Sequence, residues 1–148
     1  MENNDPATTP TTHTSPTRTD RAAAFSGHIR DAIIVGAGQA GLATAYHLQR
    51  RGVDCLVLEA ADRIGDQWRH RYDSLLLFTA NRFNSLPGLR FPGDGWGFPG
   101  KDEVAAVLQT YAERYELPVL TGSPVRHVTS SEDGFTIATP TQLYRTRV

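Results

Sequence analysis

The sequence predicts an α/β fold with a parallel sheet at its centre, and three observations lead to that prediction. A short strand is predicted at residues 31–35, apolar from residue 32 on, and it leads into glycines spaced G-x-G-x-x-G in the stretch IIVGAGQAG. Residues 42–51 follow, rich in alanine and leucine, with apolar residues at helical spacing. A second apolar run at residues 53–58 ends in Glu59. Strand, glycine turn, helix and strand in this order form one βαβ unit with parallel strands.

Each glycine of the turn has a distinct task in a phosphate-binding loop. Gly36 permits the tight turn, Gly38 lets the backbone approach a pyrophosphate, and Gly41 lets the helix pack close to the strand. Gln39 and Ala40, at the start of the helix, would present their N–H groups to the phosphates. Such a turn holds an ADP group, and it suits FAD and NAD equally. A tight turn with a purely structural role is the other interpretation of the glycines alone.

Glu59 strengthens the prediction of dinucleotide binding. It lies 18 residues after Gly41, near the spacing at which a carboxylate accepts hydrogen bonds from ribose hydroxyls. Its negative charge would repel a 2′-phosphate, which disfavours NADP at this turn.

The N-terminal segment differs in composition from the rest of the chain. Residues 1–20 contain seven threonines and three prolines, and no aliphatic residue larger than alanine. Such a segment cannot bury enough apolar surface to offset the entropy of ordering it. We therefore expect a disordered tail over residues 1–28, without the apolar region of a secretory signal, and one folded domain over residues 29–148.

Charge and composition exclude several other classes of function. Fifteen basic and sixteen acidic residues give a formal net charge of −1, so we expect neither nucleic acid nor a membrane surface as a partner. The lone Cys55 cannot form an internal disulfide, and we expect a cytoplasmic protein. The five histidines are scattered and predict no metal site, and no G-x-S-x-G motif is present. We therefore expect a cofactor to carry the chemistry.

Residues 61–104 form a long stretch rich in glycine, proline and aromatic residues, which includes RYDSLLLFT and LPGLRFPGD. Long loops of this kind are usually functional. With these motifs, residues 31–148 resemble the flavin-containing monooxygenase-like FAD-dependent oxidoreductases, which have two dinucleotide domains. The resemblance implies a Rossmann-like FAD-binding domain. It also implies FAD and NADPH as cofactors, and oxygenation of a small-molecule substrate as the activity.

The resemblance also implies roles for individual residues. It assigns the glycine turn to the ADP half of FAD, and Glu59 to the ribose. Gln67 and Trp68 match positions that run along the pyrophosphate and toward the flavin. Thr79 matches a position near the isoalloxazine, and Val125 a position that contacts adenine through its backbone.

One residue departs from the family pattern. The family often has two glycines before x-Trp, whereas here Gly65 is followed by Asp66. A carboxylate directed at a pyrophosphate would be repulsive. We therefore expect Asp66 to turn to solvent or to bond a backbone N–H.

The remaining sequence predicts a second helix and a small antiparallel β-meander. The helix begins at Asp102 and is expected to stop at Pro118. Its apolar positions share one face and predict core packing: Val104, Val107, Leu108, Tyr111, Ala112 and Tyr115. Three strands are expected at residues 124–128, 134–139 and 143–148, with a turn at residues 130–134.

The sequence contains no second G-x-G-x-x-G that follows an apolar strand, and no F-x-G-x-x-x-H, the family's monooxygenase fingerprint. We therefore expect a domain that is incomplete at its C-terminus, lacks the NADPH-binding half and is inactive alone. An open sheet edge would then favour self-association. The alternative is a stand-alone dinucleotide-binding or interaction module without turnover.

Overall fold

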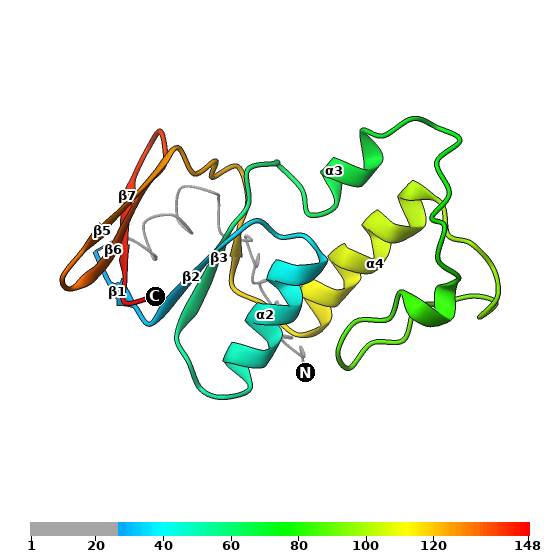
Figure 1. The fold of residues 1–148 in the computed structure, drawn as a ribbon, viewed down its shortest axis with the longest axis horizontal. Helices are drawn as coiled ribbons and strands as arrows, with labels where there is room; N and C mark the ends of the chain where they lie inside the picture. The colour runs from blue at the N-terminus through cyan, green and yellow to red at the C-terminus, as the bar shows by residue number, and fades with distance from the viewer. Residues whose placement is uncertain (1–26) are drawn as a thin grey trace, which may run out of the picture.

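The computed structural model describes residues 27–148, and nearly all of the predicted tail lies outside this range. A parallel sheet with strand order β2-β3-β4 forms the centre of the molecule (Figure 1). Its strands are β2 (Ala32–Val35), β3 (Cys55–Leu58) and β4 (Val119–Leu120). The βαβ unit predicted from the sequence is thereby confirmed.

A second sheet, with strand order β1-β7-β6-β5, lies against the first. Its strands are β1 (Ile29–Arg30), β5 (His127–Ser131), β6 (Gly134–Ala138) and β7 (Leu143–Thr146). Strands β5, β6 and β7 are antiparallel, as predicted, and β1 adds to β7 in parallel. The strand β1 was not predicted, because two residues carry no periodic signal.

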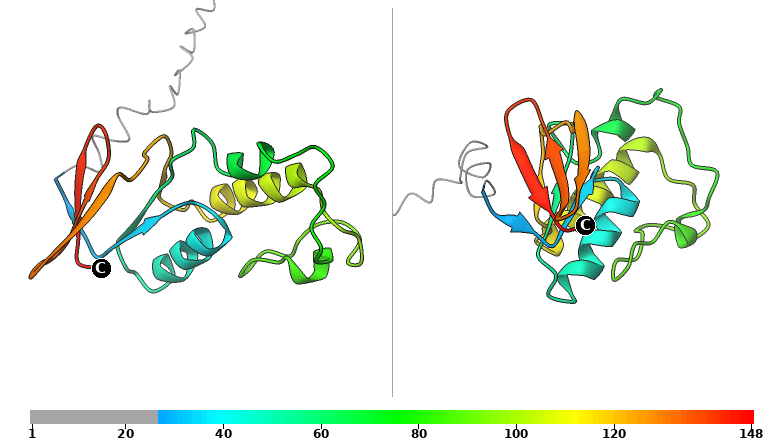
Figure 2. Two further views of the ribbon diagram at one scale, coloured as in Figure 1. Left: turned by 45° about the horizontal axis from the view of Figure 1, so that its top comes forward. Right: turned by 60° about the vertical axis from the view of Figure 1, so that its left-hand side comes forward.

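Helices cover the other face of the parallel sheet, and the views in Figures 1 and 2 agree on this arrangement. The long helices are α2 (Gln39–Gln49) and α4 (Lys101–Arg114). Two short elements, α3 (Asp66–Arg69) and the 3₁₀ helix η1 (Asn81–Phe83), interrupt the stretch that was expected to be irregular. In both views of Figure 2 the segment of residues 70–100 lies on the side of α4 away from the antiparallel strands. No helix in the part of the chain that the structure describes is long and apolar enough to cross a membrane.

Strand β3 links two apolar cores, and all four of its residues are buried. Cys55 and Val57 face the helices, whereas Leu56 and Leu58 pack toward Ile137 and the antiparallel strands. An unbroken apolar run is what a parallel strand needs when both of its faces are covered. Burial, with the nearby charge of Asp54, also raises the pKa of the Cys55 thiol. This cysteine therefore serves as core rather than as a nucleophile.

Helix α4 confirms the predicted apolar stripe but not the predicted stop. The helix ends at Arg114, and Glu116 takes a left-handed φ of 48°. The N–H groups of Glu116 and Leu117 close the helix by bonding the carbonyl groups of Glu113 and Ala112. The end therefore precedes Pro118, because a left-handed residue had already turned the chain.

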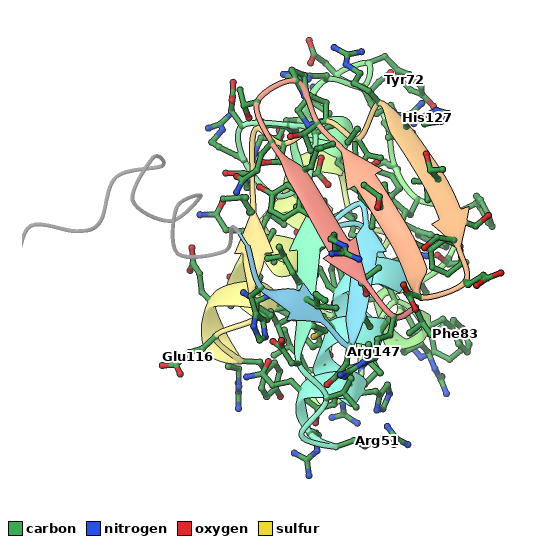
Figure 3. The ribbon with its side chains drawn as sticks, turned by 90° about the vertical axis from the view of Figure 1, so that its left-hand side faces the viewer. Arg51, Tyr72, Phe83, Glu116, His127 and Arg147 are labelled. Atoms are coloured by element: carbon green, nitrogen blue, oxygen red, sulfur yellow. The ribbon has the colours of Figure 1, made fainter. Side chains whose placement is uncertain are left out.

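Other predicted boundaries shift by a few residues. Helix α2 begins at Gln39 and ends at Gln49, so Arg50 and Arg51 lie beyond its last turn. Strand β5 begins at His127 rather than residue 124, and two residues, Glu132 and Asp133, make the turn to β6. Figure 3 looks onto the face of this sheet, where the side chain of His127 points to solvent.

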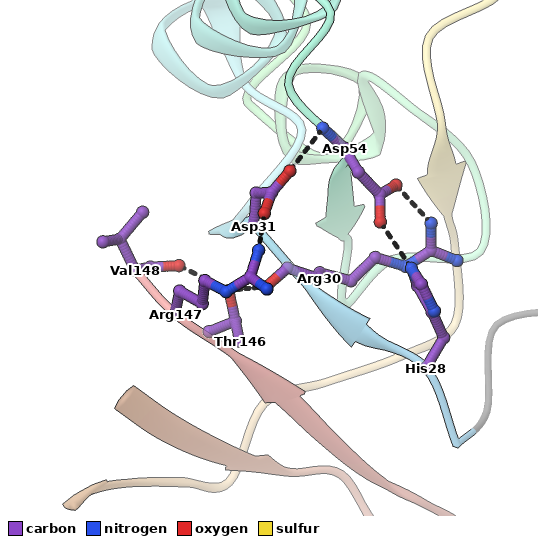
Figure 4. Close-up of polar contacts among 7 residues, drawn as sticks. All are labelled: His28, Arg30, Asp31, Asp54, Thr146, Arg147 and Val148. Carbon is purple, nitrogen blue, oxygen red and sulfur yellow. Dashed lines mark hydrogen bonds and ion pairs between the residues drawn. The ribbon is translucent and has the colours of Figure 1, made fainter. Parts of the chain in front are cut away.

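The C-terminal strand is tied to the start of the parallel sheet (Figure 4). Val148 donates to the carbonyl of Asp31 and accepts from the N–H of Ile33, each at about 3 Å. The guanidinium of Arg147 pairs with the Asp31 carboxylate, and Arg30 pairs with Asp54. Strand β7 itself pairs with β1, and Val148 extends this contact to the start of β2.

Candidate functional site

The glycine turn joins the end of β2 to the start of α2, and two of its glycines have the geometry that only glycine tolerates. Gly36 has a φ of 94°, in the region that side chains disfavour. A Cβ on Gly41 would enter the van der Waals radius of the Gly36 carbonyl oxygen and lie 3.3 Å from Ile34 Cγ2. Gly36 thus makes the turn and Gly41 lets the helix approach the strand, as predicted.

The N-terminus of α2 is open to a ligand. Gly38 is the capping residue, no side chain among the described residues caps the helix, and the first turn carries no acid. The first backbone N–H to bond within the helix is that of Leu42, with the carbonyl of Gly38. The N–H groups of Gln39 and Ala40 therefore remain available, together with the partial positive charge of the helix end.

Glu59 bridges the glycine turn and the loop that follows β3. One carboxylate oxygen accepts a hydrogen bond from the Ala37 N–H at 2.6 Å, and the other accepts one from the Ala61 N–H at 2.9 Å. The Glu59 carbonyl also accepts a bond from Ser123. A carboxylate offers about four acceptor positions, so two stay available for hydroxyl groups. Sequence reasoning missed Ala37, although its place between the first two glycines was a signal.

Gln67 lies close to the glycine turn. A Cβ on Gly38 would come within 3.2 Å of Gln67 Nε2, so this amide lies directly above the second glycine. Trp68, the next residue of α3, is half-buried and packs on the core between the helices and the sheet. Gln67 thus joins the glycine turn, whereas Trp68 anchors the short helix that positions Gln67.

The environment of Asp66 contradicts both predicted alternatives. The side chain is buried, and its Oδ1 accepts from Arg63 at 3.0 Å and from Arg69 at 3.1 Å. Burial raises the pKa of Asp66, but the hydrogen bonds and charges of the two arginines outweigh this effect and hold the pKa below its usual value. Both arginines lie three residues away, and only the fold of α3 makes them converge on one oxygen.

Thr79 and Val125 do not contact the glycine turn. Thr79 Oγ1 donates to Asn84 Oδ1 at 2.6 Å, and Asn84 Nδ2 donates to the Thr79 carbonyl at 2.9 Å, which closes a small loop. Val125 packs against the core between the two sheets, two residues before β5. Sequence reasoning placed all of these residues at one ligand, and the structure brings only part of the set together.

A pocket of about 250 Å³ connects the turn with the loop of Thr79. Gln39 and Ala40 form one side, Asn84 and Phe91 another, and Val104 belongs to the wall formed by α4. The sequence carried no signal for this grouping, because the lining residues come from three separate segments. No group of three or more His, Cys, Asp or Glu residues suitable for a metal ion occurs between residues 27 and 148.

These residues fit the ADP part of FAD. An uncapped helix N-terminus suits a pyrophosphate, and an adjacent carboxylate with free acceptor positions suits ribose hydroxyls. Gly38 leaves room above the turn that only the movable Gln67 amide borders. The site can therefore bind and orient a dinucleotide.

Comparison with known proteins agrees with this geometry. The family model for pyridine nucleotide-disulphide oxidoreductases matches residues 33–148. An uncharacterized oxidoreductase, CzcO, of Bacillus velezensis is 39% identical over 117 residues, which cover 79% of this chain and 34% of the relative. The indole-3-pyruvate monooxygenase YUCCA1 of Oryza sativa subsp. japonica is 48% identical over 82 residues, which cover 55% of this chain and 20% of the relative.

A solved structure gives the same result. The flavin-containing monooxygenase of Stenotrophomonas maltophilia superposes with a TM-score of 0.75 and 31% identity, over 80% of this chain and 36% of that one. The chain spans about a third of the length of the curated oxidoreductases it matches. The predicted resemblance to flavin monooxygenase-like, FAD-dependent oxidoreductases is confirmed, and the chain belongs to the pyridine nucleotide-disulphide oxidoreductase family.

Proposed function

We propose that residues 29–148 form the FAD-binding part of a monooxygenase that uses NADPH to oxygenate a small molecule. One observation carries the proposal: the Glu59 carboxylate is hydrogen-bonded to the N–H of Ala37 inside the glycine turn. This contact ties the proposed ribose-binding carboxylate to the proposed phosphate-binding turn within the chain itself. Preorganisation of this kind lowers the entropy that binding would otherwise cost.

Each candidate residue then has a binding role. The backbone N–H groups at Gly38, Gln39 and Ala40 would hold the pyrophosphate, and Glu59 would accept the ribose hydroxyls. FAD would supply the redox chemistry when bound. The chain contributes position and charge: the carboxylate of Glu59 disfavours a 2′-phosphate, so this turn prefers FAD to NADP.

The other candidates would contact more distant parts of the cofactor. Gln67 would lie along the pyrophosphate, since its amide already lies above the second glycine. Trp68 would flank the path toward the flavin, and Thr79 would lie near the isoalloxazine across the 250 Å³ pocket. Val125 would contact adenine through its backbone.

The nicotinamide site is proposed to lie outside these residues, because Gly36 to Gly41 is the one G-x-G-x-x-G motif that follows an apolar strand. Residues 95–100 (GWGFPG) have the same glycine spacing but follow no strand. Two relatives named monooxygenases support the oxygenation reaction. On this proposal, NADPH added anaerobically to the FAD-loaded chain should leave the flavin absorbance unchanged over the time that one enzymatic turnover takes. Rapid bleaching would contradict it, since hydride transfer requires the nicotinamide to be held against the flavin.

Titration with FAD tests the binding site directly. Glu59→Gln keeps the shape of the side chain but removes its charge, and it should weaken FAD binding by about 10- to 100-fold, or roughly 1–3 kcal/mol. Glu132→Gln is the matched control, because Glu132 is exposed in the turn between β5 and β6. Equal FAD affinity in the two variants would contradict the role of Glu59.

A second variant tests the glycine turn. Gly38→Val would place two methyl groups where the backbone must approach the pyrophosphate, so FAD binding should be lost. The Gln67 amide can move away, so most of the helical signal in circular dichroism should remain. A folded variant that still carries stoichiometric flavin would show that the turn is not the binding site.

A further inference from the structure

A second pocket lies within residues 82–96 and has an unusual charge. Its volume is about 400 Å³. The residues that line it are Arg82, Arg90, Phe91, Gly93, Gly95 and Trp96. Two arginines therefore line this pocket and no acidic residue does, although the whole chain has a formal net charge of −1.

The two arginines are not neutralised within the part of the chain that the structure describes. Several others form ion pairs with acids: Arg30, Arg63, Arg69 and Arg147. Neither Arg82 nor Arg90 forms an ion pair with any residue between 27 and 148. The nearby Asp94 directs its carboxylate to the backbone N–H of Trp96, at 3.2 Å. The positive charge of the pocket therefore remains available to a ligand.

The fold holds Arg82 in position. Its guanidinium carbon lies 4.3 Å from the centre of the Trp96 ring, and its backbone N–H donates to the Gly95 carbonyl at 3.1 Å. Asn81 fastens the same loop, because its Nδ2 donates to the Asp94 carbonyl at 2.8 Å and its backbone N–H to that of Gly97 at 2.9 Å. Stacking uses the face of a guanidinium and leaves the N–H groups at its edge to bind a planar anion.

The pocket adjoins the hollow that starts at the glycine turn. Phe91 lines both this pocket and the 250 Å³ pocket that contains Gln39 and Ala40. Phe91 and Trp96 provide aromatic surface, while Gly93 and Gly95 add no side chains to fill the space. A ligand here would meet aromatic contacts and two guanidinium groups together.

We propose that this pocket binds the carboxylate of an aromatic acid, with Arg82 and Arg90 as the two cationic contacts. Guanidinium groups bind carboxylates bidentately, and aromatic side chains favour a ligand with a flat ring. The identification of this acid as the substrate of the oxygenation rests on the proposed function. The binding itself does not, because neither Arg82 nor Arg90 lines the pocket assigned to FAD.

Benzoate, benzamide and inorganic phosphate serve as probes of the 148-residue chain at low ionic strength. NMR follows the indole N–H signals of Trp96 and Trp68 separately. Benzoate should shift the Trp96 signal saturably, benzamide should not, and phosphate should bind more weakly than benzoate. Arg82→Gln and Arg90→Gln should each weaken benzoate binding by about tenfold. Arg114→Gln is the matched control, because Arg114 also lies over an aromatic ring, that of Tyr115, but lines neither pocket.

The outcomes separate this proposal from the previous one. Absence of saturation, equal binding of benzamide, tighter binding of phosphate, or an equal loss in Arg114→Gln would each overturn the carboxylate site. Arg90→Gln is not expected to disturb the fold, because the Arg90 side chain makes no hydrogen bond or ion pair within residues 27–148. A loss of benzoate binding in this variant therefore cannot be attributed to misfolding. FAD titration of the same variants should give unchanged affinity, so failure of FAD binding would not alter the benzoate result.

Discussion

The glycine turn and the segment of residues 70–100 are held in place by different physical means. The turn follows β2, which pairs with β3, and it is held by the Glu59 side chain, whose hydrogen bonds to Ala37 and Ala61 are local. Side chains of α4 hold the segment through hydrogen bonds. Lys101 Nζ donates to the Arg71 carbonyl and to the Asp73 carboxylate, and the Tyr111 hydroxyl donates to the Pro87 carbonyl at 2.8 Å.

The exposure of apolar side chains differs accordingly. Residues Leu56 and Leu58 of the βαβ unit are fully buried, whereas Phe78 is 94% exposed. Other large apolar side chains of the segment are also exposed: Tyr72, Leu76, Phe83, Trp96 and Phe98. Apolar patches of this kind commonly mark binding surfaces. The comparison teaches that both regions contribute to one apolar core, through Ala37 and Phe91, whereas the segment also displays several large apolar side chains to solvent.

The largest effect is expected at the close approach within the turn. Gly41→Ala places a Cβ against the Gly36 carbonyl oxygen, so the backbone must move. We expect a loss of about 4 kcal/mol in the free energy of unfolding, measured in urea. Gly95→Ala is the control, because its Cβ would meet only Arg82 Cβ, at 3.8 Å. Equal stability of the two variants would contradict the tight packing inferred for the turn.

The next largest effect concerns the leucines of the two regions. Leu56→Ala removes a fully buried side chain that joins the two sheets and should cost about 3 kcal/mol. Leu76→Ala removes a side chain that is 63% exposed, and its cost should stay within about 0.5 kcal/mol. Urea unfolding of the pair gives the difference directly. A large loss for Leu76→Ala would mean that the segment has a core of its own.

A smaller, pH-dependent effect is expected from Asp66. Its pKa is lower in the folded chain than in the unfolded one, so the folded state binds this proton less readily. The stability it contributes is therefore present above about pH 4, and it is lost as pH falls through the lowered pKa. Asp66→Asn should flatten the acid limb of a stability–pH profile. Asp73→Asn is the comparison variant, because Asp73 is an exposed carboxylate whose pKa is also lowered, by its hydrogen bond to Lys101.

The smallest effect is expected in the loop that Asn84 closes. Thr79→Val removes the hydroxyl that donates to Asn84 Oδ1 and should cost about 1 kcal/mol. Hydrogen exchange should show faster opening confined to residues 79–84, with β3 unaffected. Faster exchange in β3 as well would mean that the segment and the turn unfold together.

The sequence by itself determined the βαβ unit and the tasks of its glycines. Continuous apolar runs, the spacing of Gly36 to Gly41 and the acid after β3 are local patterns, and one strand–helix–strand unit satisfies them within about 30 residues. The apolar stripe of α4 was predictable for the same reason. The end of α4 was not, because a left-handed Glu116 replaced the usual glycine.

Only the tertiary structure decided which side chains of the irregular segments meet. The pairing of Asp66 with Arg63 and Arg69 depends on the path of the chain through α3. The pocket between Gln39 and Asn84, and the juxtaposition of Arg82 with Arg90, join residues whose separation carries no periodic signal. Periodicity reports which side of an element is buried, whereas contacts between loops follow from packing of the whole chain.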